Sequence, residues 1–105
     1  MAHPIVHIEI PAADPKKSGA FYADVFGWQV QTDPQFDYTM FQADGGPGGA
    51  FPKIGANADA VPYEAGRVLV YIGSDDIDAD LRQVEEHGGQ IVMAKNEIPS
   101  VGWWA

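Results

Sequence analysis

The stretch HIEIPAADPKKSGAFYADVFGW, residues 7–28, decides the fold. It begins in a short apolar strand pattern, in which His7 and Glu9 alternate with isoleucines and therefore share one face. Asp14 then offers a carboxylate that can cap a helix, and Pro15 suits the first helical position. Apolar side chains four residues apart continue up to Gly27, a residue that favours a helix end. The stretch therefore predicts a strand followed by a helix.

The same order of residues recurs later in the chain. An Asp stands thirteen residues before a Gly in both windows, 14–27 and 75–88. A Gln and a β-branched residue follow each helix end, at 29–30 and 90–91. Self-similarity at one fixed offset predicts two copies of a single supersecondary unit.

Strand patterns around the two helices make each copy a βαβββ module. The strands expected are residues 5–10, 28–33, 37–43 and 49–54 in the first copy, and 68–73, 90–98 and a beginning at 101–105 in the second. We place module one at about 3–54, a linker of turn residues at about 55–66 and module two at about 67–105. Because the chain ends on the apolar Trp-Trp-Ala, we expect the second module to be truncated. The prediction is one α+β domain.

Composition narrows the possible partners and compartment. The formal net charge is −9, from 15 acidic and 6 basic residues, which disfavours nucleic acid and anionic membrane surfaces as partners. The sequence contains no cysteine, so disulfides, thiolate metal sites and cysteine nucleophiles are excluded. With no secretory signal pattern and no apolar run of about 18 residues, we expect a cytoplasmic protein.

Strand alternation also predicts a polar cleft. In the strand at 68–73, the apolar set Val68, Val70 and Ile72 should pack under a helix, so the alternate residues face the other way. If the polar faces of two such sheets curl toward each other, they line a shared cleft. The candidate ligand-contacting residues are His7, Glu9, Arg67, Tyr71, Tyr38 and Trp103, with Met40 beside them. The competing interpretations are a structural His7 and a solvated or hydrogen-bonded Glu9.

Four motifs resemble the vicinal oxygen chelate superfamily, which includes glyoxalase I, bleomycin-resistance proteins and extradiol dioxygenases. They are H-x-E-I-P-A-x-D-P, S-x-x-F-Y-x-x-V-F-G-W, S-D-D-I-D…H-G-G and I-P-x-V-G-W. The first two are most similar to glyoxalase-like proteins of unassigned activity. The resemblance implies paired βαβββ modules that form an incomplete barrel around a cleft, and frequently a homodimer.

The resemblance also implies where a metal would bind. Metal-binding members take one ligand from the first and last strand of each module, and His7 matches the first of these positions. The second module offers Val68 or Leu69 where a His is expected, and residues 49–54 contain no Glu. A catalytic divalent metal usually has about three protein ligands. We therefore expect no cofactor, with a divalent metal at His7 as the alternative.

Two functions of different classes follow. The first is a protein that binds a small organic molecule in the cleft, with aromatic side chains stacking and His7 and Glu9 hydrogen-bonding. The second is a divalent-metal-dependent lyase or isomerase of glyoxalase type, in which the metal polarises a carbonyl and a carboxylate moves the proton. A third interpretation is a truncated, inactive product that is held together by dimerisation.

Overall fold

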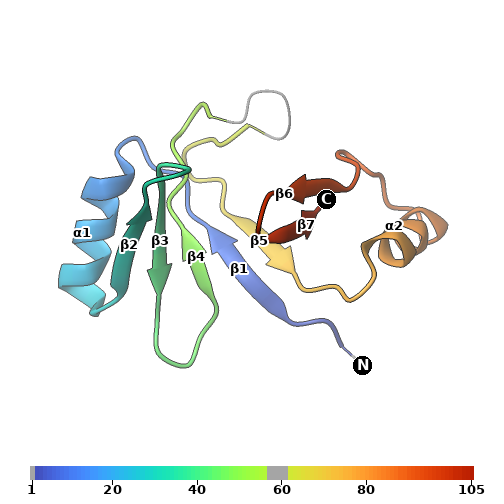
Figure 1. The fold of residues 1–105 in the computed structure, drawn as a ribbon, viewed down its shortest axis with the longest axis horizontal. Coiled ribbons are helices and arrows are strands. Elements are labelled where there is room, and N and C mark those ends of the chain that lie inside the picture. Colours follow the sequence, from blue (N-terminus) through green and yellow to red (C-terminus); the bar gives the residue numbers. More distant parts are fainter. Residues whose placement is uncertain (1, 57–61) are drawn as a thin grey trace. The chain divides into compact units, whose positions relative to one another are not determined.

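The computed structural model describes residues 2–56 and 62–105, so part of the predicted linker, residues 57–61, lies outside the described residues. The chain divides into two compact units, Met1–Gly73 and Ser74–Ala105. The first contains β1 (Ile5–Glu9), α1 (Pro15–Phe26), β2 (Gln29–Asp33), β3 (Tyr38–Gln42), β4 (Gly48–Ala50) and β5 (Leu69–Ile72) (Figure 1). The second contains α2 (Ile77–Glu86), β6 (Asn96–Ile98) and β7 (Gly102–Trp104). The predicted α+β class is confirmed.

The first unit is built on an open five-stranded sheet with the order β2-β3-β4-β1-β5. β1 runs parallel to β4 and antiparallel to β5, and β3 is antiparallel to both β2 and β4. β1, α1, β2, β3 and β4 therefore form the complete βαβββ module that the sequence predicts. β5, the first strand of module two, extends the same sheet, and α2, β6 and β7 follow it as a separate unit.

Helix α1 begins and ends where its sequence indicates. Asp14 is the N-cap and its side chain accepts a hydrogen bond from the Lys17 amide at 3.2 Å, with Pro15 following at the first helical position. Gly27 ends the helix with φ of 73°, in the left-handed region that glycine adopts without strain. A Cβ on the buried Gly19 would lie 2.8 Å from Val30 Cγ1. The absence of that side chain lets α1 lie close against β2 and β3.

The core lies on the α1 side of the sheet and is largely aromatic. Tyr22 stacks on Trp28 with ring centroids 4.9 Å apart, and Trp28 stacks on Phe41 at 4.5 Å. Phe41 then contacts Phe51, which is 1% exposed. Burying rings of this size supplies most of the hydrophobic stabilisation of so small a core. Because the core occupies the α1 side, the opposite face of the sheet is available for other side chains.

Three predicted elements differ from the structure. The N-cap of α2 is Asp76 rather than Asp75, since the Asp76 side chain accepts a hydrogen bond from the Ala79 amide. The predicted strand at 90–98 is reduced to β6, because its partner β7 offers only three residues for pairing. The predicted strand at 49–54 is reduced to β4, and Lys53 makes only an isolated bridge with Ala12.

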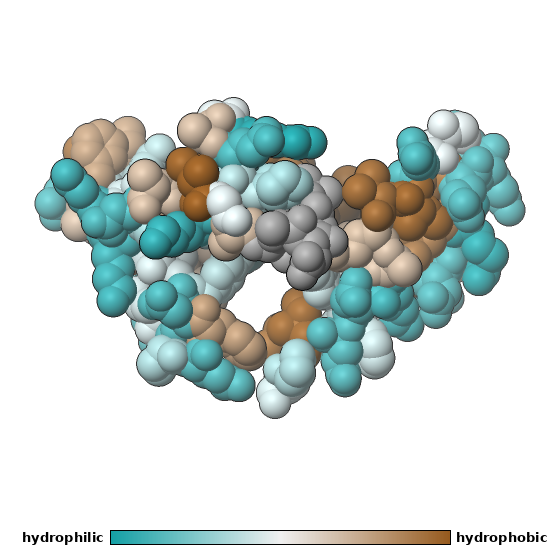
Figure 2. Space-filling model, turned by 90° about the horizontal axis from the view of Figure 1, so that it is seen from above, coloured by the Kyte–Doolittle hydropathy of each residue, from teal (hydrophilic) through white to brown (hydrophobic). Residues whose placement is uncertain are grey.

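The surface of the chain carries several apolar side chains. On α1, Phe21, Val25 and Phe26 are each more than half exposed. Figure 2 shows hydrophobic patches among hydrophilic residues on the face that it displays. Within the described residues, the structure contains no helix with the length and hydrophobicity needed to span a membrane.

Candidate ligand-binding site

Strand register determines which side chains share the face of the sheet opposite α1. Val30 and Thr39 face α1, since both would meet a side chain placed at Gly19. Their strand neighbours Gln31 and Met40 therefore face away from the helix. Residues paired across the strands give one row on this face: Gln31, Met40, Ala50, Glu9 and Leu69. In the adjacent row Gln29 pairs with Gln42, and Gly48 and Tyr71 flank His7. Residues from five strands thus meet on one surface.

Glu9 is the centre of a hydrogen-bonded cluster on this face. Its side chain is 2% exposed, and three tyrosine hydroxyls donate to it. Tyr38 donates to Oε2 at 2.5 Å, Tyr71 to Oε1 at 2.5 Å and Tyr63 to Oε2 at 3.1 Å. A buried carboxyl group is tolerated when such donors replace its lost water. Together with His7, these residues are called the Glu9 cluster below.

His7 joins the cluster through Tyr38. Its Nε2 lies 2.9 Å from the Tyr38 hydroxyl. Because that hydroxyl gives its own proton to Glu9, its oxygen is the acceptor and His7 Nε2 carries a hydrogen. The imidazole also stacks on the Tyr38 ring and meets the Tyr71 ring edge-on, with centroids 6.2 and 5.2 Å apart. The orientation of His7 is therefore fixed from two sides.

The protonation states of the cluster follow from its burial. Burial is the main cause that raises the pKa values of Tyr38 and Tyr71, and the hydrogen bonds to Glu9 and its negative charge raise them further. Burial lowers the pKa of His7, and the charge of Glu9 offsets part of that effect. At neutral pH the two tyrosines are therefore hydrogen-bond donors and the imidazole is uncharged.

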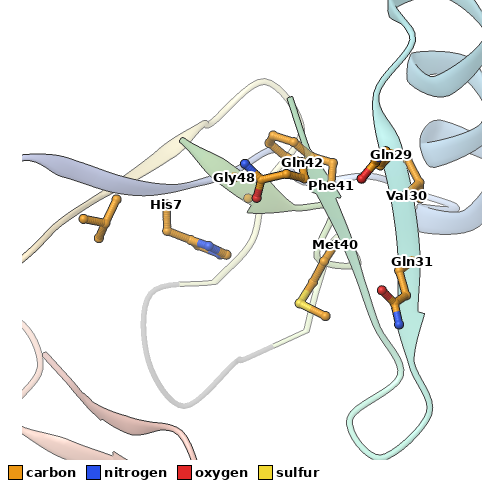
Figure 3. A pocket seen from close by; sticks show the side chains of 10 residues that line it. His7, Gln29, Val30, Gln31, Met40, Phe41, Gln42 and Gly48 are labelled. Carbon is orange, nitrogen blue, oxygen red and sulfur yellow. The ribbon is translucent and has the colours of Figure 1, made fainter. Parts of the chain in front are cut away.

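A pocket of about 410 Å³ lies beside the cluster and shares His7 with it. Figure 3 shows Gln31 of β2 and Met40 of β3, neighbours across the ladder, along its wall. The residues that line it are Val6, His7, Gln29, Val30, Gln31, Met40, Phe41, Gln42, Gly48 and Gly49. Of the described residues that line this pocket, none is an Asp, Glu, Lys or Arg. The wall thus combines an imidazole, three amides and the Met40 thioether, while the side chains of Val30 and Phe41 belong to the α1 side of the sheet.

The structure brings together four of the six residues predicted to contact a ligand. His7, Glu9, Tyr38 and Tyr71 belong to the Glu9 cluster. Arg67 lies outside it, because its exposed guanidinium pairs with Glu64 at 3.4 Å. Trp103 belongs to the second unit, where the Lys95 ammonium lies 4.8 Å from its ring centroid. A ligand-binding role for any of the six stays a prediction.

Sequence reasoning missed Tyr63 and the glutamines. Tyr63 lies in the predicted linker, and the sequence contains no signal for the path of a linker across a sheet. Gln29, Gln31 and Gln42 could have been found, since the alternation Gln-Val-Gln in residues 29–31 places both amides on the face opposite the core.

The residues present do not fit a divalent metal of the kind that the family resemblance implies. On the strands that flank β1, the residues opposite His7 and Glu9 are Gly48, Ala50, Leu69 and Tyr71. The first three cannot ligate, and the hydroxyl of Tyr71 is bonded to Glu9. The described ranges 2–56 and 62–105 contain no group of three His, Cys, Asp or Glu that could hold a metal. We therefore derive no reaction step through a metal.

Known proteins resemble this chain over most of its length. The family model of the Glyoxalase/Bleomycin resistance protein/Dioxygenase superfamily matches residues 4–102. A glyoxylase-like domain-containing protein of Didymella fabae is 34% identical over 88 residues, 79% of this chain and 66% of that protein. The anthracycline biosynthesis protein DnrV of Streptomyces peucetius is 29% identical over 106 residues, 90% of this chain and 38% of that protein. The chain thus spans less than two thirds of the length of either relative.

Solved structures share the fold at lower identity. A glyoxalase/bleomycin resistance protein/dioxygenase superfamily member from Vibrio splendidus 12B01 has a TM-score of 0.66 at 19% identity, over 97% of this chain and 84% of that chain. A Streptomyces coelicolor methylmalonyl-CoA epimerase, in complex with 2-nitronate-propionyl-CoA, has a TM-score of 0.58 at 20% identity, over 93% and 81%. At this identity the likeness shows the fold alone.

Proposed function

The chain belongs to the glyoxalase/bleomycin resistance protein/dioxygenase superfamily, and from this premise we propose that it binds a small organic molecule without a complete metal site. The observation that carries the proposal is the pocket beside the Glu9 cluster. Its volume of about 410 Å³ lies within the range of small-molecule sites.

The Glu9 cluster supports the proposal as a rigid base for the pocket. Hydrogen bonds and ring contacts fix His7, so the imidazole meets a ligand without first losing side-chain freedom. Met40 adds a polarizable thioether that packs well against aromatic rings. An aromatic ligand with hydrogen-bonding substituents fits both features.

The same cluster weakens the alternative of a metal-dependent lyase or isomerase. Glu9 and His7 are the acid and imidazole that such an enzyme would use, and both are engaged by tyrosine hydroxyls. A metal at His7 Nε2 would have to displace the hydrogen bond to Tyr38. Metal-free binding needs no such rearrangement.

The test uses 1,4-dihydroxyanthraquinone, since the name of one relative points to anthracycline biosynthesis. Its binding is measured by calorimetric titration of EDTA-treated protein, for the wild type and two variants. Gln31→Trp places a bulky ring in the pocket wall, whereas the control Gln35→Trp places the same ring at an exposed turn position outside the pocket. We expect saturable binding in the wild type. Gln31→Trp should weaken it at least about tenfold, because the new ring occupies space in which the ligand would bury its surface. Gln35→Trp should leave the affinity unchanged. Absence of binding, or binding that both variants leave intact, would contradict the proposal.

A further inference from the structure

We infer that the pocket selects an uncharged ligand with hydroxyl and carbonyl groups over an anionic one, and that Gln29, Gln31 and Gln42 determine this specificity. The inference rests on the proposed function, since it names the class of ligand for the same pocket. It is carried by the chemistry of the pocket wall and by the positions of the charged residues around it.

The three glutamines form a continuous polar strip along two strands. Gln29 of β2 lies directly opposite Gln42 of β3, and Gln31 lies two residues further along β2, opposite Met40. Figure 3 shows all three among the residues that line the pocket. Each primary amide both donates and accepts hydrogen bonds. Such a strip matches a ligand with hydroxyl donors and carbonyl acceptors.

An anionic group would find no cation in this pocket wall. Among the described residues of the first unit, Lys16 and Lys17 lie on α1, against the other face of the sheet. Lys53 is exposed and follows β4, and Arg67 pairs with Glu64. None of the four lines the pocket.

The net charge of the whole chain also disfavours an anionic ligand. With a net charge of −9, the chain repels an approaching anion. An anion that nevertheless entered the pocket would lose hydration without gaining an ionic partner, and such a loss is unfavourable. A neutral ligand is not repelled by the net charge, and the glutamine amides can replace the hydrogen bonds that its hydroxyl and carbonyl groups lose with water.

The test compares 1,4-dihydroxyanthraquinone with its 2-sulfonate, which differs by one permanent negative charge. Affinities are measured by calorimetric titration at physiological salt for the wild type, Gln31→Lys and Gln35→Lys. The two variants change the net charge equally, but only Gln31 lines the pocket. We expect the sulfonate to bind the wild type at least about tenfold more weakly than the neutral quinone. Gln31→Lys should strengthen sulfonate binding about threefold or more, and Gln35→Lys should do so by less than about twofold.

Each result has a separate meaning. Equal affinities of the wild type for the two quinones would overturn the inference and leave the proposed function standing. An equal gain in sulfonate affinity in both lysine variants would also overturn it, because total charge rather than the pocket wall would then select the ligand. Failure of both quinones to bind any of the three proteins would overturn the proposed function, and this inference with it.

Discussion

At Glu9, three phenol hydroxyls converge on a carboxyl group that is 2% exposed. These donors come from positions 29, 54 and 62 residues away in the chain. The Glu9 side chain on β1 is therefore hydrogen-bonded to β3, to β5 and to the segment before β5. Loss of the acceptor would deprive three part-buried hydroxyls of the oxygens to which they donate.

We predict that Glu9→Gln lowers the free energy of unfolding by about 2 kcal/mol, because an amide nitrogen replaces an oxygen that accepts tyrosine protons. Tyr63→Phe removes one donor and should cost about 1 kcal/mol. Urea unfolding measures both. Glu64→Gln, at an exposed ion pair, is the control and should cost less than about 0.5 kcal/mol. If Glu9→Gln and Glu64→Gln cost the same, the cluster does not hold the sheet together.

The lowered pKa of His7 predicts a loss of stability in acid. The groups that face the imidazole are Glu9, Tyr38 and Tyr71. Between the lowered folded pKa and the unfolded value of 6.5, the unfolded chain binds more protons than the folded one. The contribution of His7 is therefore complete above pH 6.5 and is lost as the pH falls through the folded pKa.

Melting temperatures between pH 8 and pH 5 measure this loss. We expect His7→Gln to show a shallower decline than the wild type, because its side chain does not titrate. Parallel curves for the wild type and His7→Gln would show that the imidazole is not held in its neutral form.

For single residues, the sequence predicts which face of the sheet a side chain occupies but not how deeply it is buried. Alternation correctly places His7 with Glu9, and Leu69 with Tyr71, on one side of the sheet. The expectation that Val68, Val70 and Ile72 pack under a helix is wrong, because all three are more than half exposed. It does not predict that Glu9 is buried, because its burial depends on tyrosines that are distant in the chain. Nor does alternation predict that Arg67 forms an ion pair with Glu64, since an exposed ion pair of this kind has no periodic sequence pattern.

Among the elements, β4 is short and is enclosed by β1 and β3. A Cβ at Gly49 would lie 1.9 Å from the backbone oxygen of Ile8. Backbone atoms cannot move away as a flexible side chain can, so only glycine allows β4 to approach β1 this closely.

We predict that Gly49→Ala lowers the free energy of unfolding by at least about 3 kcal/mol, through overpacking of this strand pair. Gly46→Ala in the preceding hairpin loop is the matched control, since nothing lies within 4 Å of its added Cβ. The control should stay within about 1 kcal/mol of the wild type. Chemical denaturation compares the two, and similar midpoints would contradict the close approach of β4 to β1.

Local capping signals predict the ends of α1 well, whereas the later strands are predicted poorly. Asp14, Pro15 and Gly27 act within one or two helical turns, so their positions determine the ends of α1. The strand predicted at 90–98 depends instead on a partner, and β7 pairs with only its last three residues. A strand pattern without a matching partner does not form a ladder.

For the whole molecule, the sequence predicts the family and the first module, and the structure adds how β5 continues that module's sheet. The homodimer that the resemblance implies stays a prediction. The exposed apolar side chains of α1 are one surface that could support it, because contiguous exposed apolar residues often mark an interface.

We predict that sedimentation gives twice the chain mass of 11.3 kDa, and that Phe21→Glu shifts the protein toward that single-chain mass. A charge at Phe21 would have to be buried in such an interface, at a cost that favours dissociation. Lys16→Glu, at an exposed position on the same helix, is the control and should leave the mass unchanged. A wild-type protein that sediments at 11.3 kDa would exclude the dimer.

The central claim is that the face carrying His7 binds its ligand without a metal. The most direct measurement is a thermal-shift titration of the EDTA-treated protein with Ni²⁺, Zn²⁺, Mn²⁺ and Mg²⁺, on the wild type and His7→Ala. A metal that binds the folded state raises the melting temperature by mass action. We expect no rise that depends on His7. A metal-dependent rise in the wild type that disappears in His7→Ala would contradict the claim and favour the metal-dependent lyase or isomerase.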